Sequence, residues 1–202
     1  MTETQESYNK LFIPSDGVYF DPENPDPDKM NIDTIAQGLA TEFRYGGHSD
    51  PLVTVAQHAV DTAEVLRELG YDAEMQFYGL HHDSAEAYLG DAQKPNKEVT
   101  PGIDEMEEVW QEAVWEFLDV PTPTEQQYGA IKEVDYRLYL HEVFELFENG
   151  AHAEAVQESF ELDDWSVDEE MPDIDELVEL GTPMQKARAE FLNTHERLSN
   201  EI

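Results

Sequence analysis

The sequence predicts an all-α protein that forms a helical bundle. Apolar residues recur at helical spacing in successive segments, and no segment shows the alternating pattern typical of a β-strand. The 202 residues are enough to bury one core, and a hydrophobic content of 40% favours a globular fold over disorder. We therefore expect one domain over residues 1–202, with its core at about 31–150 and an acidic C-terminal extension at 151–202.

The N-terminal part is turn-rich before the first predicted helix. Residues 20–30 alternate Pro with Asp and Glu, which favours turns and extended backbone. Asn31 is a good N-cap for a helix over residues 32–40. The Gly46–Gly47 pair predicts a loop beyond that helix.

Two longer helices are predicted next. Pro51 suits a helix start, and apolar spacing over residues 52–69 predicts a helix that ends at Gly70. Residues 72–89 begin with an aspartate cap and contain few β-branched residues. This segment predicts one further helix, which ends at Gly90.

The second half of the chain continues the helical pattern. Residues 91–102 predict a loop and residues 103–120 a helix. Thr124 and Gln127 have the spacing of a capping box, which predicts the start of a helix that reaches about Asn149.

The C-terminal quarter is strongly acidic. No lysine or arginine occurs over residues 138–185, and residues 161–176 predict an irregular acidic connector that Trp165 and Ile174 could pin to the core. A last helix is expected over residues 183–198.

The charge balance is unusual: 47 acidic against 11 basic residues give a formal net charge of −36. Such a surface repels itself at low salt, and the Debye length falls from about 10 Å at 0.1 M to about 3 Å at 1 M salt. The composition therefore favours a salt-rich cytoplasm, as in a halophile or its virus. The alternative is an acidic partner-binding protein, such as a nucleic-acid mimic. Binding to duplex nucleic acid or to an anionic membrane is not expected.

The sequence lacks the features of disulfide-bonded, secreted and membrane-spanning proteins. The chain has no cysteine, so disulfides and thiolate chemistry are ruled out. The N-terminus does not resemble a signal peptide, and no apolar run reaches the roughly 20 residues that span a bilayer. We expect a cytoplasmic protein.

Four residues suggest chemistry: His58, His82, Asp83 and Asp135. Nitrogen and oxygen donors of this kind suit a divalent transition metal that polarises a phosphate and activates water. Asp135 lies among apolar residues of its predicted helix, where an unpaired carboxylate would be costly to bury. Glu86 follows Asp83 by three residues and would share its helical face. Each residue alone is more often a packed or solvated side chain than a ligand.

Together these residues resemble the H…HD…D motif of the HD-domain metal-dependent phosphohydrolases. The segment HDSAEAYLGDAQKPNK, residues 82–97, is similar to the 5′-deoxynucleotidase branch and its phage and prophage relatives. So are the segments FDPENPDPDKMNIDTIAQGLA, FRYGGHSD and VAQHAV. The resemblance covers roughly residues 18–150 and implies an HD-domain helical bundle.

The resemblance also implies a set of site residues. One divalent ion (cobalt, manganese, magnesium, nickel, iron or zinc) would bind the four residues, because no histidine lies between Asp83 and Asp135 to hold a second. Asp83 and Glu86 would be catalytic, with Glu86 orienting water or transferring its proton. The substrate-binding residues would be Arg44, Tyr45, Asp91 and Lys97, with Tyr45 standing where characterised nucleotidases carry Trp.

Each substrate-binding assignment has a structural alternative. Arg44 would clamp phosphate with its planar fork or pair with a surface acid. Asp91 would accept a hydrogen bond from a ribose hydroxyl or cap the next turn. Lys97 would add a cation near the phosphate or pair with a surface acid.

The expected activity is hydrolysis of nucleoside 5′-monophosphates, with deoxynucleotides favoured and a homodimer compatible with the family. The enzymatic alternative is an HD hydrolase acting on triphosphates or on cyclic or signalling nucleotides. The non-enzymatic alternative is an acidic binding protein that keeps the fold.

Overall fold

The computed structural model describes residue 14 and residues 17–147 and 174–202. Within these ranges all regular structure is helical, and extended backbone pairs only in isolated bridges. The predicted all-α class is thereby confirmed. The elements are η1 (Pro27–Lys29), α2 (Ile32–Thr41), η2 (Arg44–Gly47), α3 (Val55–Glu68), α4 (Ala73–His81), α5 (Glu86–Leu89), α6 (Lys94–Val99), α7 (Ile103–Phe117), α8 (Glu125–Leu146), α10 (Ile174–Leu177) and α11 (Met184–Ser199).

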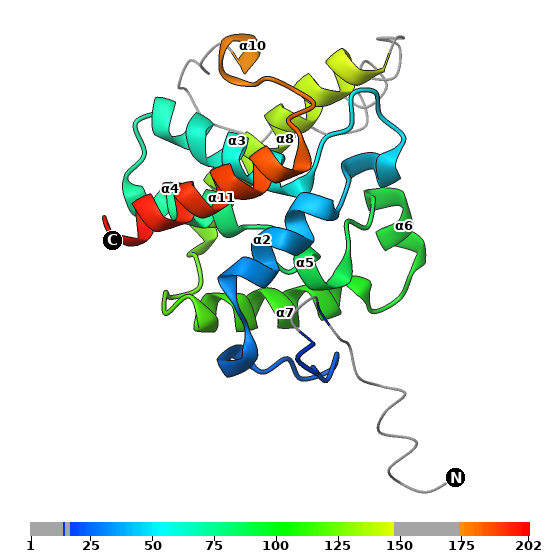
Figure 1. Cartoon of the computed structure of the whole chain (residues 1–202), viewed down its shortest axis with the longest axis vertical. Coiled ribbons are helices and arrows are strands. Elements are labelled where there is room, and N and C mark those ends of the chain that lie inside the picture. Colours follow the sequence, from blue (N-terminus) through cyan, green and yellow to red (C-terminus); the bar gives the residue numbers. More distant parts are fainter. Residues whose placement is uncertain (1–13, 15–16, 148–173) are drawn as a thin grey trace, which may run out of the picture.

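The last helix of the chain lies against the first ones. α11 packs against α2, α3 and α4, and Figure 1 shows it lying across this part of the bundle. Ala187, Phe191 and Leu198 are fully buried in the main hydrophobic cluster, as their helical spacing predicts. Residues 184–199 of the predicted extension therefore contribute to the same core as residues 31–147, while residues 151–173 lie outside the described residues.

The helices that carry the candidate histidines approach each other closely. α3 and α4 make the most extensive helix pair in the described chain, and Gly79 lies at their contact. A Cβ atom at Gly79 would overlap the Leu66 side chain and approach Thr62 Cγ2 at 3.3 Å. The absent side chain lets the backbones approach, which brings His58 of α3 near His82 at the end of α4.

The start of α3 differs from the prediction. The helix begins at Val55, not near Pro51, because Thr54 is the N-cap and its hydroxyl accepts a hydrogen bond from Gln57 N at 3.1 Å. The preceding residues are extended instead. Arg44 N donates to Val53 O at 3.0 Å, which ties the segment containing Arg44 to the extended residues just before α3.

The predicted single helix over residues 72–89 is also wrong. α4 ends at His81, and residues 82–85 form a turn before the short α5. Gln111 of α7 supplies the reason, since its side chain donates to His81 O at 2.8 Å and accepts from Ala85 N at 3.1 Å. These two bonds replace intrahelical partners and allow the backbone to turn.

The remaining boundaries follow the sequence in most places. The capping box of Thr124 and Gln127 opens α8 as predicted. The segment predicted as a loop contains the short α6. Most of the acidic connector, residues 161–176, lies outside the described residues, although Ile174 begins α10 and packs against the second hydrophobic cluster.

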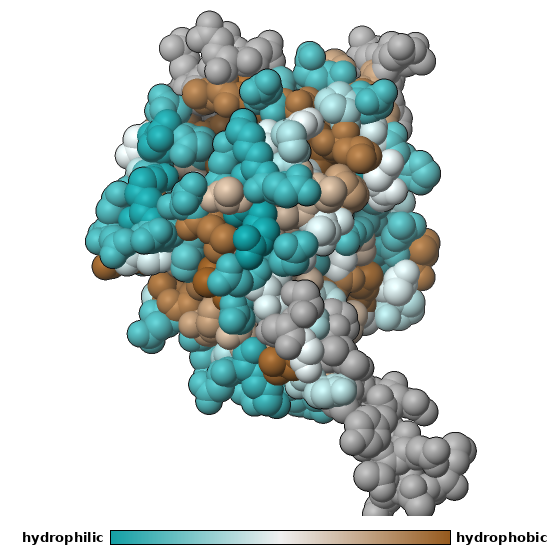
Figure 2. Space-filling view, in the orientation of Figure 1, coloured by the Kyte–Doolittle hydropathy of each residue, from teal (hydrophilic) through white to brown (hydrophobic). Residues whose placement is uncertain are grey.

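The surface in Figure 2 is mainly hydrophilic, with small apolar patches between polar side chains. The described chain contains no helix that combines the length and apolarity needed to cross a membrane.

Candidate metal centre

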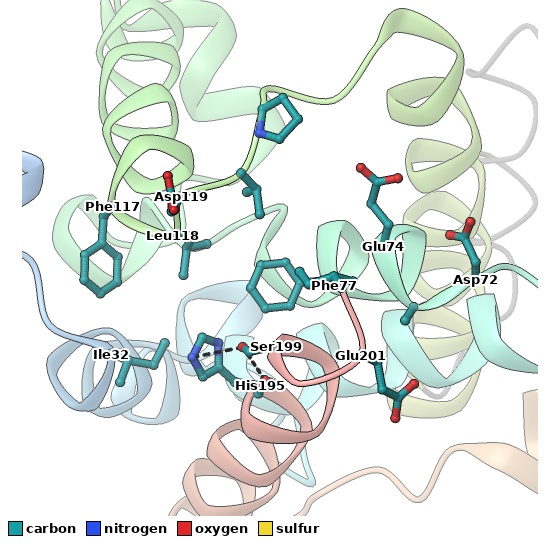
Figure 3. Close-up of a pocket in the computed structure, with 14 residues that line it drawn as sticks. Ile32, Asp72, Glu74, Phe77, Phe117, Leu118, Asp119, His195, Ser199 and Glu201 are labelled. Carbon is teal, nitrogen blue, oxygen red and sulfur yellow. Dashed lines mark hydrogen bonds between the residues drawn. The ribbon is translucent and has the colours of Figure 1, made fainter.

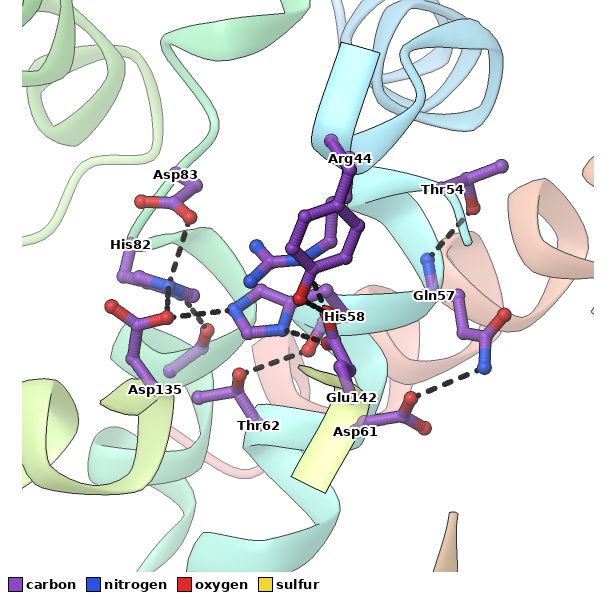
Figure 4. Close-up of polar contacts among 12 residues, drawn as sticks. Arg44, Thr54, Gln57, His58, Asp61, Thr62, His82, Asp83, Asp135 and Glu142 are labelled. Atoms are coloured by element: carbon purple, nitrogen blue, oxygen red, sulfur yellow. Dashed lines mark hydrogen bonds and ion pairs between the residues drawn. The ribbon is translucent and has the colours of Figure 1, made fainter. Parts of the chain in front are cut away.

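The four predicted ligands converge at one place. His58 comes from α3, His82 and Asp83 from the turn after α4, and Asp135 from the middle of α8. One ligand atom from each lies within 4.8 Å of the others. Figure 4 shows His82, Asp83 and Asp135 grouped on one side of the His58 ring.

Hydrogen bonds orient both imidazole rings toward this point. His82 Nδ1 lies 2.7 Å from Gly79 O, and His58 Nδ1 lies 3.0 Å from Glu142 Oε1. A carbonyl and a carboxylate can only accept, so each Nδ1 carries a hydrogen. Both Nε2 atoms therefore face the cluster, where His58 Nε2 lies 3.0 Å from Asp135 Oδ1.

The donor set fits a divalent ion. His82 Nε2 is buried without a well-aligned hydrogen bond among the described residues, although Asp83 Oδ2 lies 3.1 Å away. Ligands at about 2.1 Å from an ion lie about 3.4 Å apart in a tetrahedral site and at most about 4.2 Å apart on opposite sides of the ion, so the widest separations in this set would have to shorten on binding. Two imidazoles and two carboxylates could hold a metal ion, and this set does not discriminate among the first-row metals.

The electrostatics of the cluster favour a positive charge at its centre. Burial alone lowers the pKa of His82, but Asp83 and Asp135 outweigh it and raise the value to about 10. Burial raises the pKa of Asp135, yet Lys132 and the two imidazoles hold it well below its usual range. Protons can supply this positive charge, and a metal ion would compete with them.

A further carboxylate, Glu142, was missed by the sequence reasoning. It is only 1% exposed and accepts hydrogen bonds from His58 Nδ1, from Arg44 Nε at 2.8 Å and from Tyr45 Oη at 2.7 Å. Burial would raise its pKa, but Arg44 and these hydrogen bonds lower it to about 2. The available signal was its position seven residues after Asp135, which places both on one face of α8.

Arg44 is buried and Tyr45 is half-buried, and both contact Glu142 behind the His58 ring. Arg44 pairs with an acid, as its structural alternative holds, but the pair is buried and not at the surface: its Nε is bound to Glu142. The Tyr45 hydroxyl is also bound to Glu142, and its ring packs on Tyr139 and edge-on against Phe147. Both residues thus contact the histidine ligand through one shared carboxylate.

Lys132 is a second residue that the sequence reasoning missed. It precedes Asp135 by one helical turn, and its Nζ lies 3.1 Å from Asp135 Oδ2. Burial lowers the pKa of Lys132, but Asp135 and Asp83 outweigh it and raise the value. The signal was again the spacing on α8, in a chain with few cations.

Glu86 and Asp91 lie in the same electrostatic environment. Glu86 is buried, and its Oε2 has no hydrogen-bond partner among the described residues. Burial, Asp83 and Asp91 raise the pKa of Glu86 well above its ordinary value. Burial also raises the pKa of Asp91, and the Arg44 charge opposes that rise. Asp83 lies in the turn before α5 and Glu86 is the first residue of α5, and Glu86 N donates to Asp83 O at 3.0 Å.

Lys97 has a partner of its own. Its Nζ lies 2.6 Å from Glu107 Oε2, which matches the structural alternative of pairing with an acid. Burial lowers the pKa of Lys97, but Glu107 outweighs it, and the charges of Glu86 and Asp83 raise this pKa further. A substrate contact would require it to leave or share Glu107.

A hollow of about 770 Å³ lies away from the cluster, and none of the predicted site residues lines it. Figure 3 shows Phe77, Phe117 and Ile32 around it, with His195 and Ser199 at one side. His195 Nδ1 lies 3.0 Å from His81 Nε2, so the buried His81 is satisfied by α11 and does not join the metal ligands.

No family model matches this chain. The uncharacterized protein YfdR of Escherichia coli (strain K12) is 31% identical to it over 105 residues, which cover 52% of this chain and 56% of that protein. The match thus spans little more than half of each chain, and the relative's name states no activity.

Proposed function

We propose that this chain is a metal-dependent phosphomonoester hydrolase of the HD-domain class, most specifically a 5′-nucleotidase for (deoxy)nucleoside 5′-monophosphates. The observation that carries the proposal is the convergence of His58, His82, Asp83 and Asp135 on one point. That convergence matches the H…HD…D motif that the sequence resembles. A salt-rich cytoplasm, to which the acidic composition is suited, is the proposed location.

The local charge supports an anionic substrate in an otherwise acidic protein. With a divalent ion, Arg44 and Lys132 bring the positive charge at the centre to four. Asp83, Asp135, Glu142 and Asp91 can supply four negative charges, and burial raises the pKa of Glu86 well above its ordinary value. The cations thus offset the local carboxylates, so a phosphate monoester meets far less repulsion here than the formal charge of −36 on the whole chain would impose.

The proposed chemistry assigns a role to each side chain. A divalent ion held by the four ligands would supply Lewis acidity toward a phosphate oxygen and toward water. The Arg44 guanidinium, whose Nε is fixed by Glu142, would bind phosphate oxygens with its Nη groups. The oxygen of a water molecule would form the new bond to phosphorus while the P–O bond to the sugar breaks. Glu86, whose pKa is raised, would give its proton to the leaving 5′-oxygen, and the proton that the water loses would restore the acid form of Glu86. Asp91 would accept a hydrogen bond from a sugar hydroxyl.

The experiment is a phosphate-release screen in molar KCl with Co²⁺, Mn²⁺ or Mg²⁺. Nucleoside 5′-monophosphates, the matching triphosphates and a cyclic nucleotide are supplied separately, in ribo and deoxy forms. Release from monophosphates alone is the expected result. Release from triphosphates or the cyclic nucleotide would favour the other HD activities, and no turnover with any metal would favour an acidic binding protein.

Two variants tie any activity to this site. Asp135→Asn should abolish turnover together with metal binding. Glu86→Gln should keep metal binding and lower the turnover number by about 10²- to 10⁴-fold, the usual contribution of a general acid. Wild-type turnover in Glu86→Gln would remove Glu86 from the mechanism.

A further inference from the structure

We propose that Glu142 is a positioning residue that couples metal binding to anion binding, by holding a metal-facing histidine with one oxygen and the Arg44–Tyr45 pair with the other. This inference rests on the proposed function for its catalytic meaning. Its binding consequences depend only on the metal and phosphate affinities of the site.

The two oxygens of Glu142 have separate tasks. Oε1 lies 3.0 Å from His58 Nδ1, which turns Nε2 of that ring toward Asp135. Oε2 accepts from Arg44 Nε at 2.8 Å and from Tyr45 Oη at 2.7 Å. Figure 4 shows Glu142 beside the His58 ring with Arg44 nearby. A single carboxylate therefore lies behind both the metal-facing imidazole and the guanidinium.

The surrounding structure leaves this carboxylate little freedom. Glu142 and His58 are 1% and 0% exposed, and Glu142 lies on α8 two turns beyond Asp135. Tyr45 has a φ of 60°, a backbone region that is uncommon for a residue with a side chain. Its hydroxyl bond to Glu142 and its ring contacts with Tyr139 and Phe147 hold it there.

Glu142 contacts the Arg44 guanidinium at Nε, and this contact can orient the guanidinium for anion binding. Glu142 binds Nε at 2.8 Å, and the side chain of the neighbouring Tyr45 also interacts with the guanidinium. Glu142 and Tyr45 thus orient the guanidinium, and the N–H groups that they do not engage could bind a phosphate. A carboxylate behind a metal-binding histidine fixes the tautomer and orientation of the ring, and its loss typically costs about 10- to 100-fold in metal affinity or activity.

The test compares Glu142→Gln with Glu133→Gln in the full chain. Glu133 is a matched control, because it is also buried on α8 and bonded to an arginine, Arg137, at 2.8 Å. Co²⁺ affinity and the visible Co²⁺ spectrum are measured first, on metal-stripped protein in molar KCl. Binding of inorganic phosphate to the Co²⁺-loaded protein is measured next, at saturating metal.

Glu142→Gln should weaken Co²⁺ binding by about 10- to 100-fold, alter the Co²⁺ spectrum and weaken phosphate binding to the loaded protein. One amide cannot accept from His58, Arg44 and Tyr45 as a carboxylate does. Glu133→Gln should leave all three readouts unchanged. The inference would be overturned if a folded Glu142→Gln protein bound both Co²⁺ and phosphate with affinities within twofold of those of the wild type.

Two more variants separate positioning from folding. Arg44→Met should weaken phosphate binding but keep Co²⁺ affinity, and adding Glu142→Gln to it should cost little further phosphate affinity, since the two act as one unit. Additive losses would overturn the coupling. If Glu142→Gln does not fold, Tyr45→Phe replaces it, and an unchanged phosphate affinity there would overturn the inference.

Failure of this inference and failure of the proposed function are distinguishable. Unchanged titrations in Glu142→Gln, with wild-type hydrolysis of monophosphates intact, would remove only the role of Glu142. If Glu142→Gln lost both Co²⁺ and phosphate affinity but the wild type hydrolysed no substrate, the coupling role of Glu142 would stand and the proposed hydrolase activity would be wrong.

Discussion

Lys132 Nζ lies 3.1 Å from Oδ2 of Asp135, so the carboxylate that faces the metal cluster also holds a lysine on its outer side. Under the proposed function, Lys132 would offer a positive charge to a phosphate bound beside Asp135. It also competes with a metal ion for the electron density of that carboxylate.

We expect Lys132→Met to bind Co²⁺ more tightly and inorganic phosphate more weakly. The Lys132 side chain is 35% exposed, so each effect should be about fivefold, equivalent to about 1 kcal/mol. Calorimetric titration of Co²⁺, then of phosphate into the loaded protein, measures both. Lys186→Met, which removes an exposed lysine paired with Glu190 on α11, should change neither. Parallel changes in the two affinities would contradict this role.

Metal binding should stabilise the folded protein through Asp135. A ligand at 100 times its Kd adds about 2.7 kcal/mol to the free energy of unfolding. Thermal unfolding with and without Co²⁺ in molar KCl should show this gain in the wild type, and Asp135→Asn should lose most of it. Asp33→Asn, which breaks a surface ion pair with Arg188, should keep the gain. An equal gain in Asp135→Asn would show that Co²⁺ binds elsewhere.

Gly79→Ala should destabilise the protein by about 1–3 kcal/mol, the usual cost of overpacking a tight contact. The new methyl group would overlap Leu66 and separate α3, which carries His58, from α4, which ends just before His82. Chemical denaturation measures the loss. Gly129→Ala on α8 is the matched control, because a Cβ there meets nothing within 4 Å, and it should be neutral or slightly stabilising. Equal effects of the two variants would refute the close-approach argument.

Asp61 should make the stability of the protein depend on pH. Burial raises the pKa of Asp61 to about 7, despite the opposing charge of His58. Between about pH 4 and pH 7 the unfolded chain loses this proton while the folded chain keeps it, so stability falls as pH rises. Above pH 7 the penalty is complete.

Asp61→Asn removes that penalty. We expect it to raise the free energy of unfolding by about 1–2 kcal/mol at pH 8.5 and to have little effect at pH 4.5. Denaturant unfolding at both pH values in molar KCl checks this, with the exposed Asp28→Asn as the control. A gain of the same size at pH 4.5 would mean that the Asp61 proton is not the cause.

Much of the fold could be predicted because it depends on local patterns. Helical spacing of apolar residues and the Thr124–Gln127 capping box correctly indicated α8 and its start. The four proposed ligands could be named from their order and residue types, and they do converge. The break after His81 could not be predicted, since it depends on Gln111 from another helix.

The sequence by itself determined the helical class, the ligand types and the acidic charge, because periodicity and composition act over a few neighbouring residues. The tertiary structure alone decided which polar groups share a site. Glu142 reaches His58 across 84 positions of sequence and Arg44 across 98. Such contacts depend on how α3, α8 and the Arg44 loop pack together, and no local pattern encodes that packing.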